Sequence, residues 1–254
     1  MTLPCWRSTV LGTALLAVFA GTARAQVTAE QILERVDENM TIRTVHTRAI
    51  MSVTYREGDV RDLEFESWAE GEQRSFLEFT SPPRDAGSRF LRVDDKMWIY
   101  LPRAARSVRI QGRMLEQGLM GSDFSYGDAS ENPSMVDDYD AVIEREEPFE
   151  GRPAYVLFLT GKRSGLAYPQ RRIWVDAERW VPLKEERFAR SGKLLKTAVL
   201  SDVRQIEGRW YPFQMDLDNA LQADTRTSLR FLELEFDTDI PERVFSLRTL
   251  ERGF

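Results

Sequence analysis

Cysteine and histidine are almost absent from this chain of 254 residues, which holds one of each, Cys5 and His46. A zinc site with several histidine or cysteine ligands is therefore excluded, because such a site needs three or four of them. A single cysteine cannot form a disulfide within the chain, so the hydrophobic core must hold the fold. The residues indicate no metal and no cofactor.

Long apolar runs are missing after residue 25, where no stretch approaches the ~18 apolar residues of a membrane-spanning helix. Before that point, Arg7 precedes eleven apolar residues, Val10 to Ala20, and Ala23-Arg24-Ala25 has the pattern of a cleavage site. The apolar run would reach only about 16 Å across a hydrocarbon core of roughly 30 Å. We therefore expect residues 1–25 to be a cleaved secretory signal peptide. The mature chain, from Gln26, would be periplasmic and not embedded in a membrane.

An excess of positive charge is missing as well. The formal net charge is −6 at pH 7, and loss of Arg7 and Arg24 with the signal peptide would make it −8. A chain with this charge is repelled by nucleic acids and by anionic lipid surfaces. We expect no nucleic-acid partner, and contacts with partners mainly through apolar surface.

The residues that follow the signal peptide predict one helix and then many strands. Thr28 and Gln31 have the spacing of a capping box, and Ile32, Val36 and Met40 share one face of a helix that ends near Met40. From residue 43 to residue 56 apolar and polar side chains alternate, which is typical of a strand with one buried face. No linker divides residues 26–254, so we expect a single domain.

Short turns then separate a series of strand-like runs rich in β-branched and aromatic residues. These runs lie at about 60–69, 73–80, 88–93, 97–101, 106–110, 139–146, 153–160, 170–176, 181–189, 194–206, 210–217 and 225–237. Strands joined by such short turns are antiparallel. The sequence therefore predicts a mainly β fold, a meander of hairpins, and argues against a doubly wound α/β fold.

Catalytic patterns are weak. Adjacent carboxylates occur, such as Asp94-Asp95, Asp137-Asp138, Glu146-Glu147 and Glu185-Glu186. Neighbouring residues on a strand point to opposite faces, so such pairs do not converge on one substrate. The run from Gly118 to Ser122 lacks the lysine of a phosphate-binding loop. We expect no enzymatic activity, with a hydrolase that uses scattered carboxylates as the least favoured alternative.

The most distinctive stretch runs from Met97 to Tyr126. It begins Met-Trp-Ile-Tyr-Leu-Pro-Arg and ends Gly-Leu-Met-Gly-Ser-Asp-Phe-Ser-Tyr, so apolar side chains occur where a polar loop is usual. Residues 97–101 and 154–159 are apolar on both faces of a strand. Either these strands are covered on both sides, or one of their faces lines a cavity.

These motifs resemble the LolA-like and LolB-like periplasmic carriers of lipoproteins, in particular an uncharacterised subgroup. Further matches are Arg172–Asp176, Val181–Leu183 and Gly208–Pro212. The resemblance implies a single antiparallel sheet of about eleven strands, curled into a half-open barrel. It also implies that the N-terminal helix and a lid, here residues 111–138, lie on the concave side.

The resemblance also implies a function in lipoprotein sorting to the outer membrane: a chaperone that binds acyl chains of lipids or lipidated proteins in an apolar cavity. An inner-membrane exporter of the resistance-nodulation-division class is the expected partner. The alternative is an adaptor of an envelope export complex that carries no ligand. Which arginine latches the lid, Arg43, Arg48 or another, stays open.

The candidate site residues form three groups. The helix residues Ile32, Val36 and Met40 are expected to face the cavity. Arg103, Arg106 and Arg109 are candidates for contact with headgroups or a partner, or are edge-strand charges that block aggregation. The candidates for lining the cavity or the lid are Met97, Trp98, Tyr100, Leu119, Met120, Phe124, Tyr126 and Trp174.

Overall fold

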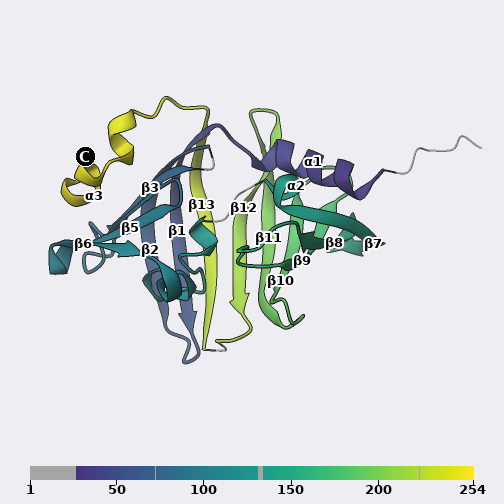
Figure 1. Ribbon diagram of the computed structural model, residues 1–254, viewed down its shortest axis with the longest axis horizontal. Helices are drawn as coiled ribbons and strands as arrows, with labels where there is room; N and C mark the ends of the chain where they lie inside the picture. Colours follow the sequence, from purple (N-terminus) through teal and green to yellow (C-terminus); the bar gives the residue numbers. More distant parts are fainter. Residues whose placement is uncertain (1–26, 72, 131–133, 223) are drawn as a thin grey trace, which may run out of the picture.

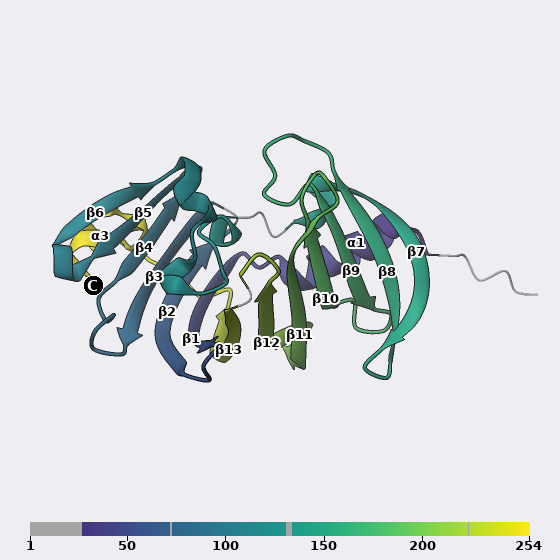
Figure 2. The same cartoon turned by 90° about the horizontal axis from the view of Figure 1, so that it is seen from below.

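Thirteen strands form one antiparallel sheet, which curves without closing into a barrel (Figure 1, Figure 2). The structure is a computed structural model that describes residues 27–71, 73–130, 134–222 and 224–254. The predicted signal peptide lies outside the described residues. Within the described ranges, no helix has both the length and the apolar character needed to cross a membrane.

Each strand-like run of the sequence corresponds to one strand of the sheet, and the predicted meander is confirmed. The count is two higher than the resemblance implied. The strands are β1 (Thr44–Tyr55), β2 (Val60–Glu70), β3 (Arg74–Ser81), β4 (Arg89–Val93), β5 (Lys96–Leu101), β6 (Arg106–Ile110), β7 (Tyr139–Phe149), β8 (Arg152–Gly161), β9 (Gln170–Asp176), β10 (Pro182–Phe188), β11 (Leu194–Ile206), β12 (Arg209–Asn219) and β13 (Thr225–Phe236).

The order of the strands places the first and last strands of the chain side by side near the middle of the sheet. From one edge to the other the order is β6-β5-β4-β3-β2-β1-β13-β12-β11-β10-β9-β8-β7. The chain therefore builds outward from β1 to the edge strand β6, passes to the opposite edge strand β7, and builds back to β13. Residues 111–138, which we call the crossing segment, connect these two edge strands, and the described parts, 111–130 and 134–138, lie across the inside of the curved sheet (Figure 2).

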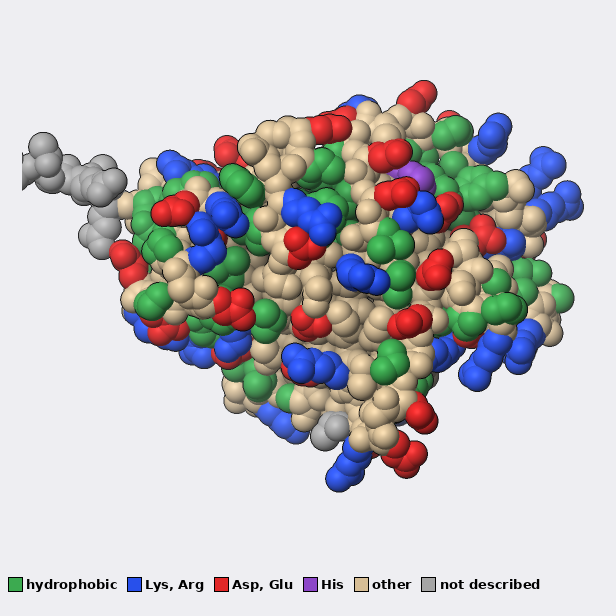
Figure 3. All heavy atoms as spheres, turned by 180° about the vertical axis from the view of Figure 1, so that it is seen from behind, with side chains coloured by type: hydrophobic (Ala, Val, Ile, Leu, Met, Phe, Trp, Pro, Cys, Tyr) green, Lys and Arg blue, Asp and Glu red, His purple; other side chains and the backbone are tan. Residues whose placement is uncertain are grey.

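The two faces of the sheet differ in polarity as the alternation in the sequence predicts. On β1, Ala49, Met51 and Val53 are buried on the concave face. Arg48 lies on the convex face, where its guanidinium contacts Glu233 at 2.8 Å. Figure 3 shows that much of this convex side carries interspersed positive and negative side chains.

Helix α1 (Ala29–Met40) begins with the predicted capping box, in which the Thr28 hydroxyl accepts from the Gln31 backbone N–H and the Gln31 side chain accepts from the Thr28 N–H. It packs on the concave face of β7, β8 and β9, where Leu157, Leu159 and Ile173 are fully buried. The position of the N-terminal helix on the concave side is thus the one that the resemblance implied.

The convex face is covered at one end by the last part of the chain. A 3₁₀ turn, η5 (Glu242–Phe245), and helix α3 (Leu247–Arg252) pack on β3, β4 and β5. Val244 and Leu250 are buried there against Phe76 and Leu91 of the sheet. Strands β3 to β5 are therefore covered on both faces, which explains why residues 97–101 are apolar throughout.

Candidate functional site

In its described residues the crossing segment consists of short helical turns. These are three 3₁₀ turns, η2 (Gly112–Glu116), η3 (Leu119–Gly121) and η4 (Asp128–Ser130), and one α-helix of four residues, α2 (Met135–Asp138). Between η2 and η4 the chain folds back on itself through a bridge between Gly118 and Ser125, and the Leu119 N–H donates to the Phe124 carbonyl at 2.6 Å. This small loop lies over the arm of the sheet formed by β1 to β6.

The tight closure of this loop requires a glycine at position 118. A Cβ atom at this position would lie 2.2 Å from the backbone oxygen of Ser122, which is far inside van der Waals contact. The absence of a side chain therefore lets the loop close, and the closed loop directs Leu119 toward the sheet.

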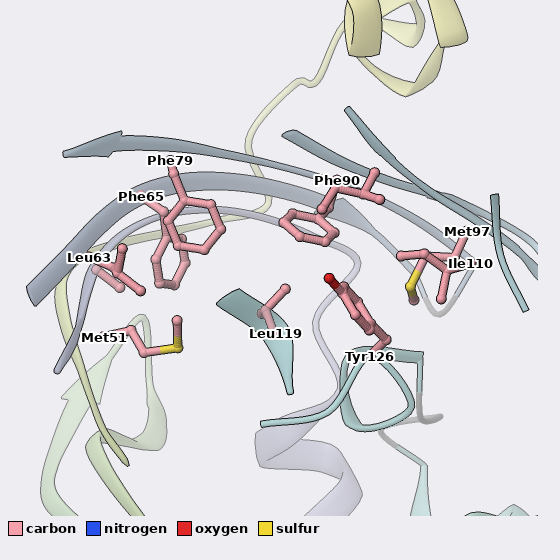
Figure 4. Packing of buried hydrophobic residues seen from close by; sticks show 11 residues of the cluster. Met51, Leu63, Phe65, Phe79, Phe90, Met97, Ile110, Leu119 and Tyr126 are labelled. Atoms are coloured by element: carbon pink, nitrogen blue, oxygen red, sulfur yellow. The ribbon is translucent and has the colours of Figure 1, made fainter. Parts of the chain in front are cut away.

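Apolar side chains of the crossing segment fill the concave face of this arm. Figure 4 shows Leu119 and Tyr126 directed toward Phe79 and Phe90. The rings of Tyr126 and Phe90 have centroids 5.5 Å apart. Because these side chains are buried mainly against the sheet, withdrawal of the crossing segment would expose a continuous apolar surface.

The other candidates in this segment also contact the sheet. Met120 is partly buried against the same cluster of side chains. Phe124 touches that cluster and a second one formed by Ala198, Leu200 and Leu217. Phe124 therefore bridges the two arms of the curved sheet.

Three predicted lining residues lie on the opposite, convex face. Met97 packs under the crossing segment. Because side chains alternate along a strand, Trp98 and Tyr100 point to the other face, toward the C-terminal helix α3. Trp174 is likewise on the convex side, where its indole N–H donates to Glu147 at 2.6 Å and its ring lies 4.2 Å from the Lys184 ammonium. These three aromatic residues do not share a space with Leu119.

The helix and arginine candidates lie away from the small loop between Gly118 and Ser125. Ile32 and Val36 are fully buried against β7 to β9, and Met40 packs at the same contact. The three arginines, Arg103, Arg106 and Arg109, are exposed on or next to the edge strand β6, and none makes an ion pair within the described part of the chain.

Two cations of the sheet bind backbone oxygens of the crossing segment. The guanidinium of Arg61 on β2 donates to the Met120 carbonyl at 3.0 Å and also pairs with Asp85 at 2.7 Å. The ammonium of Lys196 on β11 donates to the Asp123 carbonyl at 2.8 Å. Arg61 and Lys196 therefore hold the segment in place. Arg43 and Arg48 contact Asp237 and Glu233 instead.

A group of buried charges, which we call the charged cluster, lies where the crossing segment meets the other arm. The Asp128 carboxylate of the crossing segment contacts Arg187 at 2.9 Å and pairs with Lys196. It also accepts a hydrogen bond from the Tyr168 hydroxyl at 2.6 Å. Burial would raise the pKa of Asp128, but the two cations and these hydrogen bonds outweigh it and lower the pKa to about 2.

The rest of the charged cluster comes from the sheet alone. Glu185 on β10 lies between Arg171, at 2.8 Å, and Arg187, at 3.0 Å. Burial opposes ionisation of this carboxyl, and the two guanidinium groups reverse that effect, so its pKa is lowered. The Tyr139 hydroxyl accepts a further hydrogen bond from Arg171 at 2.8 Å.

A cavity of about 720 Å³ opens beside the charged cluster, between the crossing segment and the loop that joins β8 to β9. This volume is in the range of about 300–1,000 Å³ that is typical of small-molecule sites. Its polar lining includes the cations Lys196, Arg171 and Arg163, the carboxylates Glu116 and Asp138, and Tyr168. Its apolar lining includes Leu115, Leu166, Ala167, Leu195 and Leu221.

Sequence reasoning did not select the charged cluster, although one signal for it was present. Arg171 alternates with Ile173 and Val175, so a period of two places its side chain on the buried face of β9. A charged side chain on a buried face requires a partner. That rule could have identified Arg171 as a functional candidate.

Three solved structures with the same fold are similar to this chain. A DUF1329 family protein from Desulfovibrio piger is 24% identical, with a TM-score of 0.79 over 87% of this chain and 97% of that one. A LolA superfamily protein from Nitrosomonas europaea is 24% identical, with a TM-score of 0.74 over 89% and 100%. A domain from Vibrio parahaemolyticus, named for outer membrane lipoprotein sorting, is 25% identical, with a TM-score of 0.75 over 88% and 98%.

No curated protein matches the chain. A family model described as that of an uncharacterized protein matches residues 71–252, which is well over half of the sequence. That range contains eleven of the thirteen strands, all except β1 and β2, and all of the crossing segment. The chain therefore belongs to this uncharacterized, DUF1329-like family, and its fold is that of the LolA superfamily.

Proposed function

We propose that this protein is a periplasmic carrier that binds the acyl chain of a lipid or a lipidated protein on the concave face of its sheet. The observation that carries the proposal is the combination of a displaceable segment with an apolar surface beneath it. Leu119 and Phe124 come from a segment without long helices, and the cavity lies directly beside it.

The forces that hold the crossing segment are suited to displacement. Its apolar contacts with the sheet can be replaced by contacts with an acyl chain, because the hydrophobic effect is not directional. Its polar anchors to the sheet lie at separate points: Arg61 and Lys196 bind two of its backbone oxygens, and the carboxylates of Asp123 and Asp128 bind groups of β13, β10 and β11. An acyl chain could therefore replace the segment with little loss of buried apolar area.

The length of an acyl chain explains why its transfer through water needs a carrier. Each buried CH₂ group contributes roughly 0.8 kcal/mol, so a chain of about 14 carbons is held in a membrane by about 11 kcal/mol. A soluble protein that covers the chain lowers the barrier to crossing water. The likeness to a domain named for outer membrane lipoprotein sorting supports this role.

The direction of ligand transport must be set by other proteins. The sequence holds no nucleotide-binding motif, so we propose that an inner-membrane exporter of the resistance-nodulation-division class supplies the ligand and that an acceptor at the outer membrane removes it. The signal peptide predicted in residues 1–25 supports a location between these two membranes.

Ligand capture tests the proposal directly. The protein is purified from its native periplasm and extracted with organic solvent, and the extract is analysed by mass spectrometry. In parallel, uptake of a fluorescent long-chain fatty acid is titrated. We expect co-purified lipid and saturable uptake, whereas an empty extract together with no uptake would overturn the carrier role.

A matched pair of variants locates the binding. Ala167 is exposed at the wall of the cavity, and Ala104 is equally exposed near the far edge strand β6. Ala167→Trp should reduce uptake at least severalfold by filling the cavity, and Ala104→Trp should leave it unchanged. Equal effects of the two changes would show that the ligand does not enter this cavity.

A further inference from the structure

Asp128 is the one carboxylate of the crossing segment that pairs with cations of the charged cluster among the described residues. Its side chain is 3% exposed, and those of Arg187 and Lys196 are 9% and 8% exposed. The Ser125 hydroxyl and backbone N–H donate to the same carboxylate at 2.9 and 2.6 Å. Asp128 is therefore held like a bound anion.

The sheet itself leaves this group of charges unbalanced. Its contribution to the charged cluster is three cations, Arg171, Arg187 and Lys196, and a single carboxylate, Glu185. Two other buried carboxylates in the described part of the crossing segment have partners elsewhere. Asp123 is bound by the hydroxyls of Thr225 and Thr227, each at 2.7 Å, and Asp138 pairs with Arg163 at 2.7 Å. Asp128 thus brings a negative charge to two cations of the sheet, Arg187 and Lys196.

Displacement of the crossing segment would remove that negative charge. Uncompensated charges in a buried place are strongly unfavourable, so removing one partner of a buried pair destabilises the partner that remains. A neutral ligand would bear this cost in full. An anionic ligand would avoid it by placing its own charge between Arg187 and Lys196.

Resting on the proposed carrier function, we propose that Asp128 occupies the place of the ligand's anionic headgroup. The ligand is then an amphiphile with a carboxylate or phosphate head and an apolar chain. Its head binds Arg187 and Lys196, and Tyr168 donates a hydrogen bond to it. Its chain follows the leucines of the adjacent cavity, since Lys196 and Tyr168 line that cavity together with Leu195 and Leu166.

This inference narrows the cargo. An acylated protein whose chains are joined only by neutral ester and amide bonds offers no anion to the charged cluster. A free fatty acid or a lipid phosphate does. The two sources of negative charge share the same recognition by guanidinium and ammonium groups.

Chain-matched competitors test the inference on the full mature protein. A bound fluorescent fatty acid is displaced by hexadecanoate, by hexadecyl phosphate or by hexadecanol, and the competition constants are compared. At least one anion should compete about tenfold or more tightly than hexadecanol, and the tighter of the two identifies the headgroup. Equal competition by the alcohol and both anions would overturn the headgroup site and leave the carrier function intact.

Absence of fluorescent probe binding, together with no displacement by any competitor and no co-purified lipid, would instead overturn the carrier function itself. The two failures are therefore distinguishable. Added salt gives a second reading, because it should weaken the two anions more than the alcohol.

Variants of the charged cluster provide the decisive comparison. Asp128→Asn removes the internal competitor and should tighten the binding of the preferred anion by about tenfold relative to hexadecanol. The double change Asp128→Asn with Lys196→Gln removes both charges of one buried pair and should abolish the preference for anions. Because both partners are replaced, no isolated charge from that pair threatens folding.

A double change at an exposed pair serves as the control. Asp218 and Arg226 contact each other at 3.4 Å on β12 and β13, with side chains more than half exposed. Asp218→Asn with Arg226→Gln should leave the order of the three competitors as it is in the unmodified protein. Thermal unfolding confirms that each variant folds. An anion preference that persists in the Asp128→Asn, Lys196→Gln protein would contradict the inference.

Discussion

The carboxylate of Asp37 in α1 accepts a hydrogen bond at 3.0 Å from the backbone N–H of Met135, which lies 98 residues further along the chain. The same carboxylate accepts from the Val136 N–H at 3.0 Å and from the Ser134 hydroxyl at 2.9 Å. It therefore satisfies the first free N–H groups of α2, as an N-cap residue would. The N-terminal helix and the end of the crossing segment are thereby joined.

Removal of this cap should destabilise the protein. For Asp37→Ala we expect a loss of about 1–3 kcal/mol in the free energy of unfolding, since a hydroxyl and two backbone N–H groups lose their acceptor in a buried place. Urea titration measures the change. Glu34→Ala, an exposed position on the same helix, should stay within about 0.5 kcal/mol of the unmodified protein. A similar loss in both variants would refute the role of the cap.

The free energy of unfolding should depend on pH through Asp128. Its folded-state pKa of about 2 is below its ordinary value of 3.8, so its contribution is present above about pH 4 and is lost as the pH falls through about 2. The shift corresponds to about 2 kcal/mol. The difference in unfolding free energy between the unmodified protein and Asp128→Asn should shrink by about this amount between pH 5 and pH 2.

Exposed Asp59, at the turn between β1 and β2, supplies the control for this measurement. The difference between the unmodified protein and Asp59→Asn should stay nearly constant over the same pH range. A constant difference for Asp128→Asn as well would mean that its carboxylate does not stabilise the folded state.

Loss of the Arg61 anchor should loosen the crossing segment. In Arg61→Met the Met120 carbonyl loses its donor, and a hydrogen bond to a charged group contributes about 1.5–3 kcal/mol. Amide hydrogen exchange at Leu119 and Ser122 should then become at least about tenfold faster, while amides in β8 exchange as before. Asp85→Asn breaks the neighbouring ion pair and keeps the contact with Met120, so it should change Leu119 exchange much less.

Weaker packing of the crossing segment should favour ligand binding. Leu119→Ala removes a buried side chain and should cost about 2–4 kcal/mol of stability in the ligand-free protein. Because the ligand must displace this segment, the same change should tighten fatty-acid binding severalfold. Val142→Ala, at an exposed position of β7, should change neither quantity. Weaker binding by Leu119→Ala would indicate that Leu119 contacts the ligand directly.

Most of the fold could be predicted from local sequence patterns. The capping box at Thr28 and the alternation of side chains depend on neighbours in the sequence, so the helix and the strands could be predicted within a few residues of their ends. The lid position of residues 111–138 rested on the resemblance, because nothing local indicates that the segment crosses from one edge strand to the other.

The candidate site was harder to predict because its contacts are distant in sequence. Trp98 and Met97 are adjacent and equally apolar, and only the location of α3 and of the crossing segment tells which face each one covers. The pairing of Asp128 with Arg187 joins residues 59 positions apart. A pattern of charges along the chain does not reveal such a pair.

The crossing segment starts at one free edge of the sheet, β6, and ends at the other, β7. Its span is therefore set by how far apart the two arms of the sheet stand. Under the proposed carrier function, a wide ligand that spreads the arms would stretch the crossing segment and draw it away from the sheet, and a narrow ligand would leave it slack. The curvature of the sheet and the movement of the crossing segment would then be coupled, so that the width of the ligand, as well as its chemistry, would set how far the segment moves.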